Sequence, residues 1–445
     1  MLDELRSRLA CPVLGPLDAG YGEQVAGFDL GLVHRPDAVA LPERAEDVCA
    51  AVRLAVEAGV PVHVLGSGHA DVPPVTAGLM ISARRLDSVR LDAGSRTAVI
   101  GAGCTWHDVL EVATPVGLAP VCGSAPAVGV GGFLLGGGLG PLCRTYGFST
   151  DHVRAFELVG ADGELRTVTP GDELFFALRG GKGGFGVVVS ATVELPELPS
   201  FYGGGGFYAA EDIPAVLHAF RRFTNDDVPD ELSVSVAILR LPDAAPIPLH
   251  GQTVAHLRMA YAGPPAEAEA LLAPLRIGPP LLGAATELAY ADIGKVHGDP
   301  TIPSAHSTGG MLLHALERET VDALMAVAGP AVHAPLAIVE LRHLGGAVRR
   351  PPPERDAVSG RDAAYGLWVS SPPAPARDPA AGAAVRGVLD AVAPWSTGAV
   401  QINFCGSENT AEEAARAWAP DVAAELAAIR RRIDPAGVFA FTPGS

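Results

Sequence analysis

The sequence Val62-His63-Val64-Leu65-Gly66-Ser67-Gly68-His69 is an apolar stretch that leads into a short loop between glycines and ends on a histidine. A second glycine-rich stretch follows later in the chain, Ala125-Pro126-Ala127-Val128-Gly129-Val130-Gly131-Gly132-Phe133-Leu134-Leu135-Gly136-Gly137-Gly138-Leu139-Gly140. Glycine lets the backbone adopt positive φ and come close to a ligand, so that successive N–H groups can point at one diphosphate. One such stretch alone is more often a simple turn, but two in the same half of the chain predict a dinucleotide-binding site.

The spacing of these glycines disfavours two common nucleotide-binding motifs. Gly129-Val130-Gly131-Gly132 lacks the full GxGxxG frame with its flanking strand, helix and acidic residue, so a Rossmann domain is not expected. The chain also has no GxxxxGK[ST] motif, which argues against a nucleotide hydrolase.

Composition indicates a large globular protein. The 445 residues are 48% hydrophobic, which is enough for two domains that share an interface. The net charge of -18 and the absence of a basic stripe disfavour nucleic acid as a partner, because phosphate binding depends on clustered Lys and Arg. The six cysteines show no CxxC pairing and no partner histidine pattern, so we expect free thiols, and neither a metal site nor a disulfide framework.

Residues 112–143 carry no charged side chain and have the length of a membrane span. Their prolines and many glycines would leave backbone groups unsatisfied in lipid, so we interpret the segment as a buried cofactor-binding loop and expect no membrane insertion. The N-terminal residues are partly acidic, with no apolar core of a secretory signal. We therefore expect a cytoplasmic protein.

Hydrophobic periodicity in the first part predicts a strand at residues 37–41, a helix at 43–58 and a strand at 60–65. This β-α-β unit delivers the Gly66 to His69 loop at the carboxyl end of its second strand, where open α/β sheets bind ligands. Further strands are expected at residues 79–82, 89–92 and 97–101, a helix at 106–113, and a hairpin at 153–167.

The composition changes at residues 196–206, where prolines and then four glycines indicate a boundary. Strands are expected at residues 232–239, 253–261, 337–344 and 365–370, and helices at 209–223, 266–275, 317–328 and 422–432. The prediction is an α+β fold whose second part is an antiparallel sheet backed by helices.

The strand around Glu340 is the best candidate for chemistry outside the glycine loops. Glu340 and Arg342 share one face of that strand, while Val339, Leu341 and His343 share the other. Glu340 could act as a base if its pKa were raised or tuned by its surroundings, with Arg342 orienting it or binding an anionic substrate. The alternative, an exposed cross-strand ion pair, is equally open from the sequence.

Other polar residues allow two interpretations each. Tyr146 packs beside a cofactor or in the core, and Asn403 hydrogen-bonds flavin or substrate or caps backbone at a strand end. His297, His306 and His314 lack the spacing of metal ligands, which favours solvated or core histidines. For Lys182 a solvated loop lysine is preferred over a phosphate contact.

Taken in order, these segments resemble the vanillyl-alcohol oxidase and p-cresol methylhydroxylase (PCMH) flavoprotein superfamily, in the subgroup of berberine bridge enzyme-like and 6-hydroxynicotine oxidase-like oxidases. The resemblance extends through Tyr146-Gly147, Asp151-His152-Val153 and residues 159–163, 178–187, 401–404 and 433–439. It implies a two-lobed PCMH-type FAD-binding domain at residues 1–198, a substrate domain at 199–398, and a C-terminal segment at 399–445 that returns to the FAD domain.

The resemblance also implies the cofactor and its attachment. The family's histidine carries the 8α-carbon of FAD, and it corresponds to His69. The residues expected to bind FAD are Leu65, Gly66, Ser67, Gly68, His69, Ala70, Ala125, Val128, Gly129, Gly131, Gly132, Gly136, Gly137, Gly138, Gly140 and Val187. The second attachment residue of bicovalent members, a cysteine, is Ala125 here, so a single bond through His69 is expected, with a register slip to Cys122 as the alternative. The chain also departs from the family at Leu65, often arginine, and at Gly184, usually asparagine.

By resemblance, the reaction is oxidation of an alcohol, an amine or an activated C–H bond of a small molecule. A base such as Glu340 takes a proton, hydride passes to flavin N5, and molecular oxygen is reduced to hydrogen peroxide, with Arg342, Tyr146 and Asn403 as further candidate catalytic residues. The segment at residues 132–142 also resembles oxygenating flavoproteins of polyketide biosynthesis of the enterocin type, which use a flavin N5-oxide. A non-catalytic flavin-binding protein is the third possibility. Substrate identity and oligomeric state stay open.

Overall fold

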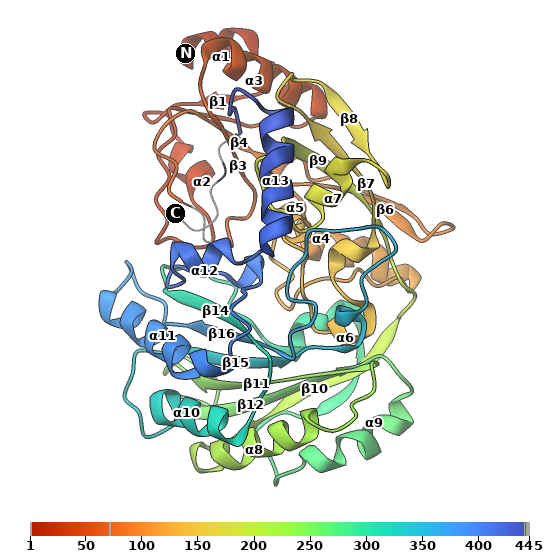
Figure 1. Ribbon diagram of the computed structural model, residues 1–445, viewed down its shortest axis with the longest axis vertical. Coiled ribbons are helices and arrows are strands. Elements are labelled where there is room, and N and C mark those ends of the chain that lie inside the picture. Colours follow the sequence, from red (N-terminus) through yellow and green to blue (C-terminus); the bar gives the residue numbers. More distant parts are fainter. Residues whose placement is uncertain (1, 71–72, 440, 442–445) are drawn as a thin grey trace.

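The computed structural model describes residues 2–70, 73–439 and 441. Three sheets organise these residues (Figure 1). Two smaller sheets form lobes built by the N-terminal part of the chain, and a seven-stranded sheet lies beneath them in the view of Figure 1. Helix and sheet are mixed as an α+β fold requires, which confirms the predicted fold class.

The first lobe contains a four-stranded sheet in the order β1-β2-β4-β3. Its strands are β1 (Val13–Leu14), β2 (Ala38–Ala40), β3 (Val62–Leu65) and β4 (Leu79–Ser82), and its helices are α1 (Leu2–Arg8), α2 (Tyr21–Val25) and α3 (Ala45–Ala58). β2 and β3 both pair in parallel with β4, which therefore lies between the strands that flank α3. β4 is buried at all four residues, as a central parallel strand should be.

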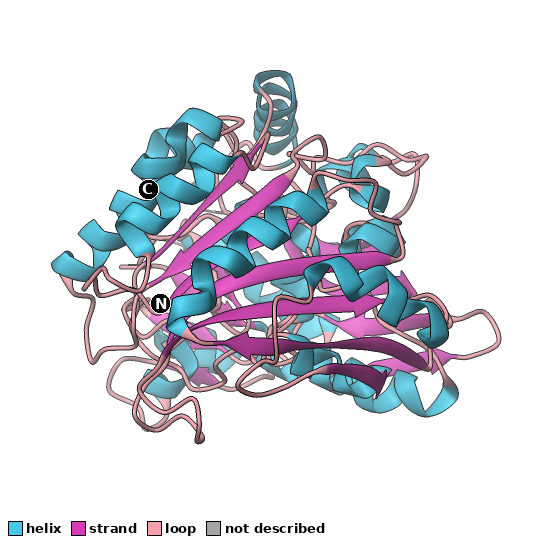
Figure 2. Cartoon of the chain, turned by 90° about the horizontal axis from the view of Figure 1, so that it is seen from below, coloured by secondary structure: helices cyan, strands magenta, loops and turns pink. Residues whose placement is uncertain are grey.

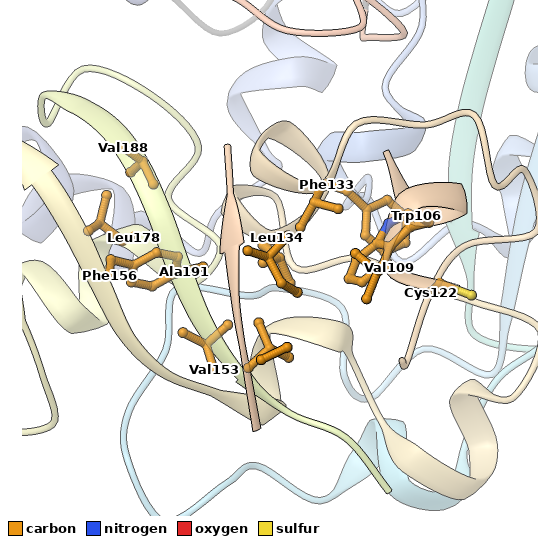
Figure 3. Close-up of a cluster of buried hydrophobic side chains, with 14 of the residues drawn as sticks. Trp106, Val109, Cys122, Phe133, Leu134, Val153, Phe156, Leu178, Val188 and Ala191 are labelled. Atoms are coloured by element: carbon orange, nitrogen blue, oxygen red, sulfur yellow. The ribbon is translucent and has the colours of Figure 1, made fainter. Parts of the chain in front are cut away.

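The second lobe contains a five-stranded antiparallel sheet in the order β5-β6-β9-β7-β8. The strands are β5 (Val89–Asp92), β6 (Thr97–Gly101), β7 (Val153–Val159), β8 (Leu165–Val168) and β9 (Val187–Glu194), and the helices are α4 (Trp106–Ala113), α5 (Val130–Leu135), α6 (Cys143–Tyr146) and α7 (Glu173–Leu178). The predicted hairpin is β7 and β8. Trp106 and Phe133 meet edge to face in the core between these elements (Figure 3).

The third sheet has seven strands in the order β13-β10-β12-β11-β15-β16-β14, with every neighbouring pair antiparallel. The strands are β10 (Ser200–Tyr208), β11 (Leu232–Arg240), β12 (Thr253–Tyr261), β13 (Ala285–Ala289), β14 (Thr308–Leu313), β15 (Ile338–His343) and β16 (Tyr365–Ser370). The predicted boundary needs one correction, because the four glycines Gly203 to Gly206 lie inside β10. Their small size fits a buried strand approached closely on both sides, as at Gly205, where a methyl group would lie 2.4 Å from the Leu257 carbonyl oxygen.

Helices cover one face of this sheet, as predicted (Figures 1 and 2). They are α8 (Ile213–Thr224), α9 (Pro265–Leu272), α10 (Arg318–Ala328) and α11 (Pro379–Val392). Val216 and Phe220 of α8 share a core with Val236 and Leu257 of the sheet. The opposite face of the sheet is turned toward the two N-terminal lobes.

The C-terminal segment returns to the first two lobes. After α12 (Ala411–Ala415), α13 (Pro420–Ile433) places the Arg430 guanidinium within hydrogen-bond distance of the carbonyl oxygens of Gly181 (2.8 Å) and Gly183 (3.0 Å). Beyond the helix, the Val62 N–H donates to the Val438 carbonyl oxygen, 2.7 Å away, so residues 438–439 pair with β3. In the described residues, no helix has the length and apolar character to cross a membrane.

Arg144 of α6 joins the second lobe to the seven-stranded sheet. Its buried guanidinium donates to the carbonyl oxygens of Val228 (2.7 Å) and Leu232 (2.8 Å) and also to that of Leu344. Arg144 thereby satisfies three backbone acceptors across the interface.

We expect Arg144→Ala to lower the free energy of unfolding by roughly 3 kcal/mol or more, because buried carbonyl groups lose a charged donor. Urea denaturation followed by tryptophan fluorescence measures the change. Arg350→Ala is the matched control, because Arg350 is an exposed arginine paired with Asp230 at the same interface, and its loss should cost less than about 1 kcal/mol. Equal effects of the two substitutions would contradict the assignment.

Candidate cofactor and active site

The two glycine-rich loops meet at the Ser67 hydroxyl. The Gly129 N–H donates to Ser67 Oγ over 3.0 Å, and the same oxygen lies 2.9 Å from His69 Nδ1. Thr105, just before α4, bridges to Gly129 and holds the second loop from its other side. Two segments that the sequence singled out separately are therefore parts of one site.

The His69 ring is held by a segment that the sequence analysis did not identify. It stacks on Phe28 with ring centres 4.1 Å apart and an interplanar angle of 13°. The Phe28 N–H donates to the carbonyl oxygens of Ser67 and Gly68, and Gly68 adopts a φ of 69° against the backbone of Gly27. Burial, followed by the nearby His306, lowers the pKa of His69 to about 4, so the ring is neutral near pH 7.

Open space lies beside both loops. A methyl group added at Gly66 or Gly132 would meet no atom within 4 Å, whereas at Gly131 it would lie 2.8 Å from the Ala102 carbonyl oxygen. Gly131 and Gly132 belong to the first turn of α5, where the helix itself offers their N–H groups no acceptor. Free room, backbone donors and a neutral histidine are the features that a covalently held flavin dinucleotide requires, so these residues fit FAD.

Asn403 and Lys182 hold the second loop in place through hydrogen bonds to its backbone. Asn403 Nδ2 donates to the Phe133 carbonyl oxygen (2.9 Å), and Lys182 Nζ donates to Asn403 Oδ1 (2.5 Å) and to the Gly132 carbonyl oxygen (2.9 Å). Burial lowers the pKa of Lys182 to about 8. The interpretation of Lys182 as a solvated loop lysine is therefore wrong, and the Asn403 amide is occupied in shaping the loop.

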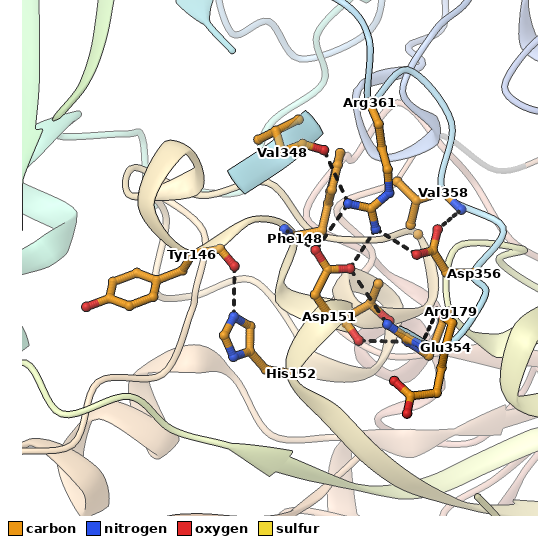
Figure 4. Close-up of polar contacts among 12 residues, drawn as sticks. Tyr146, Phe148, Asp151, His152, Arg179, Val348, Glu354, Asp356, Val358 and Arg361 are labelled. Atoms are coloured by element: carbon orange, nitrogen blue, oxygen red, sulfur yellow. Dashed lines mark hydrogen bonds and ion pairs between the residues drawn. The ribbon is translucent and has the colours of Figure 1, made fainter. Parts of the chain in front are cut away.

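Tyr146 lies at the edge of the same region. It packs against the core of the second lobe, its carbonyl oxygen lies 2.9 Å from His152 Nε2, and burial raises the pKa of its hydroxyl. In Figure 4 its ring points away from the ion pair of Asp151 with Arg361, whose closest atoms are 2.6 Å apart. Asp151 and its neighbours thus have a structural role in joining residue 361 to the second lobe.

Glu340 and Arg342 lie on the face of β15 that is turned toward the lobes, as the alternation predicts. Val339 and Leu341 contribute to the core on the helix side, while Arg342 Nη1 donates to the Leu139 carbonyl oxygen at the end of the glycine-rich stretch. Glu340 is only 5% exposed, so the alternative of a solvent-exposed ion pair is wrong.

Three groups surround the Glu340 carboxylate at the same distance. His297 Nε2, Arg258 Nη1 and Arg342 Nη2 each lie 3.2 Å from Glu340 Oε1. Burial alone would raise the pKa of Glu340, but Arg342, the hydrogen bond from His297 and Arg258 together hold it well below its usual value. A base at this position needed a pKa raised by burial or tuned by its surroundings, and the neighbours of Glu340 tune its pKa downward.

Sequence reasoning missed Arg258 and placed His297 among the solvated or core histidines. His297 follows a 3₁₀ helix (Tyr290–Val296) that packs at Gly294 against Pro126 of the second loop, and Arg258 lies on β12, two strands from Glu340. No local pattern pairs these residues. A weak signal in the sequence was the Arg258 side chain, which together with His256 interrupts the mostly apolar strand predicted at residues 253–261.

The remaining predicted cofactor residues divide by burial. Leu65 and Val187 are core side chains, and Ala70, Ala125 and Val128 are partly exposed. Gly136, Gly137, Gly138 and Gly140 are buried behind the loop. Within the described residues Cys11, Cys49, Cys104, Cys122 and Cys143 are free thiols, and no group of three or more His, Cys, Asp or Glu is arranged to hold a metal.

Gly132→Ala tests whether the open space belongs to a ligand. We expect the variant to leave the thermal midpoint of the apoprotein within about 2 °C, because the added methyl meets no protein atom within 4 Å, and to lower FAD incorporation roughly tenfold if FAD occupies that space. The flavin-to-protein absorbance ratio measures incorporation. Gly387→Ala, at another helical glycine with no atom within 4 Å, is the control and should keep full incorporation. Normal FAD content in Gly132→Ala would show that the ligand lies elsewhere.

Comparisons with known proteins agree with this site. The FAD binding domain family matches residues 36–169, which include both loops. (R)-6-hydroxynicotine oxidase from Paenarthrobacter nicotinovorans is 34% identical over 205 residues, covering 44% of this chain and 45% of that protein. The chain spans less than half the length of the curated relatives it matches.

Solved structures match along the whole chain at low identity. A berberine bridge enzyme-like protein from Physcomitrella patens superposes with a TM-score of 0.85 at 18% identity, covering 100% of this chain and 98% of that one. Glucooligosaccharide oxidase from Acremonium strictum, which carries a 6-S-cysteinyl, 8α-N1-histidyl FAD, superposes with a TM-score of 0.82 at 22% identity, covering 98% of both chains. The chain therefore carries an FAD-binding domain at residues 36–169 and has the fold of the berberine bridge enzyme-like flavoproteins of the vanillyl-alcohol oxidase and p-cresol methylhydroxylase family.

Proposed function

We propose that this protein is an FAD-dependent oxidase whose flavin is attached to His69. Its substrate is an alcohol, an amine or an activated C–H compound of small size, natural-product intermediates included, and molecular oxygen is the electron acceptor. One observation carries the proposal: the Ser67 hydroxyl joins His69 to Gly129, beside open space at Gly66 and Gly132.

The surroundings of His69 support a single covalent bond. A neutral imidazole has a lone pair available for bond formation, and the lowered pKa keeps the His69 ring in that form. Ala125 offers no nucleophile. Cys122, the alternative second attachment residue, is a core side chain whose thiol pKa is raised by burial to about 12, so it is unreactive near neutral pH.

Bound FAD supplies a two-electron acceptor that oxygen can regenerate. The protein's own residues then bind and orient the substrate and accept the proton that it loses. The polar face of β15 combines ionised groups with proximity to the second loop, because Arg342 donates to the Leu139 carbonyl oxygen. Buried arginines on either side of Glu340 fix the carboxylate in place, which suits a positioning role better than that of a free base.

Oxygen consumption and peroxide formation test the activity. Purified protein with bound flavin is mixed anaerobically with a panel of sugars, secondary alcohols, cyclic amines and phenols, and bleaching of the flavin absorbance is recorded. The proposal expects bleaching by at least one class and one hydrogen peroxide per turnover in air. Product that contains an oxygen atom from O₂, with an altered resting flavin spectrum, would instead assign an N5-oxide type oxygenase. If no compound of the panel reduces the flavin, the protein binds flavin without oxidase activity and the proposal is wrong.

The pH dependence of flavin attachment tests the state of His69. Because the neutral ring is the reacting form and its pKa is about 4, the rate constant for covalent incorporation of FAD into apoprotein should change less than about twofold from pH 8 to pH 5.5. A histidine of ordinary pKa would lose about tenfold over that range. His69→Ala, which should show no incorporation at any pH, is the control. A tenfold loss in the wild type would contradict the lowered pKa.

A further inference from the structure

A small cavity lies between the end of the glycine-rich stretch and the seven-stranded sheet. Its volume is about 10 Å³, close to what one water molecule needs. The side chains and backbone that form its wall include Gly140, Cys143, Ser235, Arg258, His297 and Arg342. The cavity therefore has room for one oxygen atom with its hydrogens, and it lies beside the Glu340 cluster.

Two residues of the cavity wall each carry one buried polar atom that has no hydrogen-bond partner among the described residues. These atoms are His297 Nδ1 and Ser235 Oγ, on side chains that are 6% and 4% exposed. An unpaired buried polar atom costs about 1–3 kcal/mol, so a native structure that keeps two of them beside one cavity requires an explanation. An oxygen bound in the cavity could accept a hydrogen bond from Ser235 and donate one to His297.

The direction of that second hydrogen bond follows from the contacts of the other ring nitrogen. Glu340 Oε1 lies 3.2 Å from His297 Nε2, and a carboxylate can only accept, so Nε2 carries the hydrogen. Arg342 Nη2 lies 3.5 Å from the same nitrogen, at the outer limit, and it donates instead to both Glu340 oxygens at 3.2 Å. In the neutral ring Nδ1 is then an acceptor with a free lone pair.

The charges around His297 keep it neutral at rest. Burial and then Arg258 lower its pKa, and the Glu340 carboxylate opposes them. His256, behind Arg258, also has a pKa well below its usual value, and the Cys143 thiol faces the cluster with a raised pKa. Asp299 acts on Arg342 at longer range. A neutral imidazole beside a fixed carboxylate can accept a proton, because the carboxylate stabilises the imidazolium that forms.

We propose that His297 is the proton acceptor of this site, with Glu340 as the positioning residue that fixes its tautomer. The inference rests on the proposed oxidase function. A hydroxyl proton of the substrate passes to His297 Nδ1 while Nε2–H stays bonded to Glu340, and bound FAD would supply the acceptor for the hydride of the oxidised carbon. The proton afterwards leaves to solvent. Ser235 donates to the oxygen from which Nδ1 takes the proton.

The tautomer can be measured without any substrate. In holoenzyme labelled with ¹⁵N-histidine, and assigned with the His297→Ala variant, we expect His297 to show Nε2–H and unprotonated Nδ1 at pH 7, with titration below pH 6.5. A His297 signal with Nδ1–H, or an imidazolium at pH 7, would overturn the proposal. This result is independent of whether any compound reduces the flavin, so it separates failure of this inference from failure of the proposed function.

The kinetic consequence is tested with the compound that reduces the flavin fastest in the panel. We expect His297→Ala to keep its FAD content and to lower the rate constant of anaerobic flavin reduction at least 100-fold, with at least tenfold recovery in added imidazole. His343→Gln is the control, because His343 is a buried histidine of β15, the strand that carries Glu340, and lies near Tyr365 on the opposite face of that strand. The rate constant of this variant should change less than threefold. Reduction of His297→Ala at the wild-type rate would overturn the proposal.

The Glu340→Gln variant distinguishes a role of Glu340 in positioning His297 from a purely structural role. Since the Glu340 carboxylate raises the pKa of His297, its removal should move the acidic limb of the kcat/KM profile to lower pH and reduce the rate about tenfold. An unchanged limb with a lower rate would reduce Glu340 to a structural residue and contradict its assigned role. If Glu340→Gln does not fold, the tautomer of His297 measured in the wild-type holoenzyme still tests the proposal.

Discussion

The Ser67 hydroxyl is the interaction on which the candidate site depends. One oxygen accepts the Gly129 N–H and contacts His69 Nδ1, so it fixes the distance between two loops that are far apart in the sequence. Such a junction requires close backbone approach, and this explains the glycines. Gly68 lies against Gly27 with positive φ, and at Gly129 even a methyl group would lie 3.0 Å from Ser67 Oγ. The glycines of the two loops are therefore explained by the close contact between the loops as well as by the space that a ligand would need.

A second constraint is the charge buried between the lobes and the large sheet. Arg258 and Arg342 share one carboxylate, Glu340, and a buried charge that loses its partner is strongly destabilising. Arg144 adds hydrogen bonds to three backbone carbonyls across the same interface. The seven-stranded sheet is therefore held in a defined position relative to the glycine loops. A fixed position is what a reaction between a bound cofactor and a substrate requires.

Local patterns predicted much of the fold and little of the polar site. The strands β4, β5, β6, β12 and β16 and the helix α4 lie at the predicted residues, because alternation and helical spacing depend on near neighbours. The partners of Glu340 could not be predicted, because Arg258 and His297 reach it only through the register of β11, β12 and β15 and through the packing of a 3₁₀ helix on Pro126. Lys182 was misjudged for the same reason, since its acceptors, Gly132 and Asn403, come from distant segments. The prediction that Glu340 and Arg342 share one face of β15 was correct, because successive side chains of a strand point to opposite faces of the sheet.

Intact mass after acid denaturation tests the central claim most directly. Wild-type protein and Ser67→Ala are purified under the same conditions, precipitated with acid, and weighed by mass spectrometry together with the released flavin. The account predicts that the wild-type chain gains the mass of one FAD, which a peptide map assigns to His69, and that Ser67→Ala carries clearly less. FAD found wholly in the supernatant of the wild type, or attached to a residue outside the two loops, would contradict it.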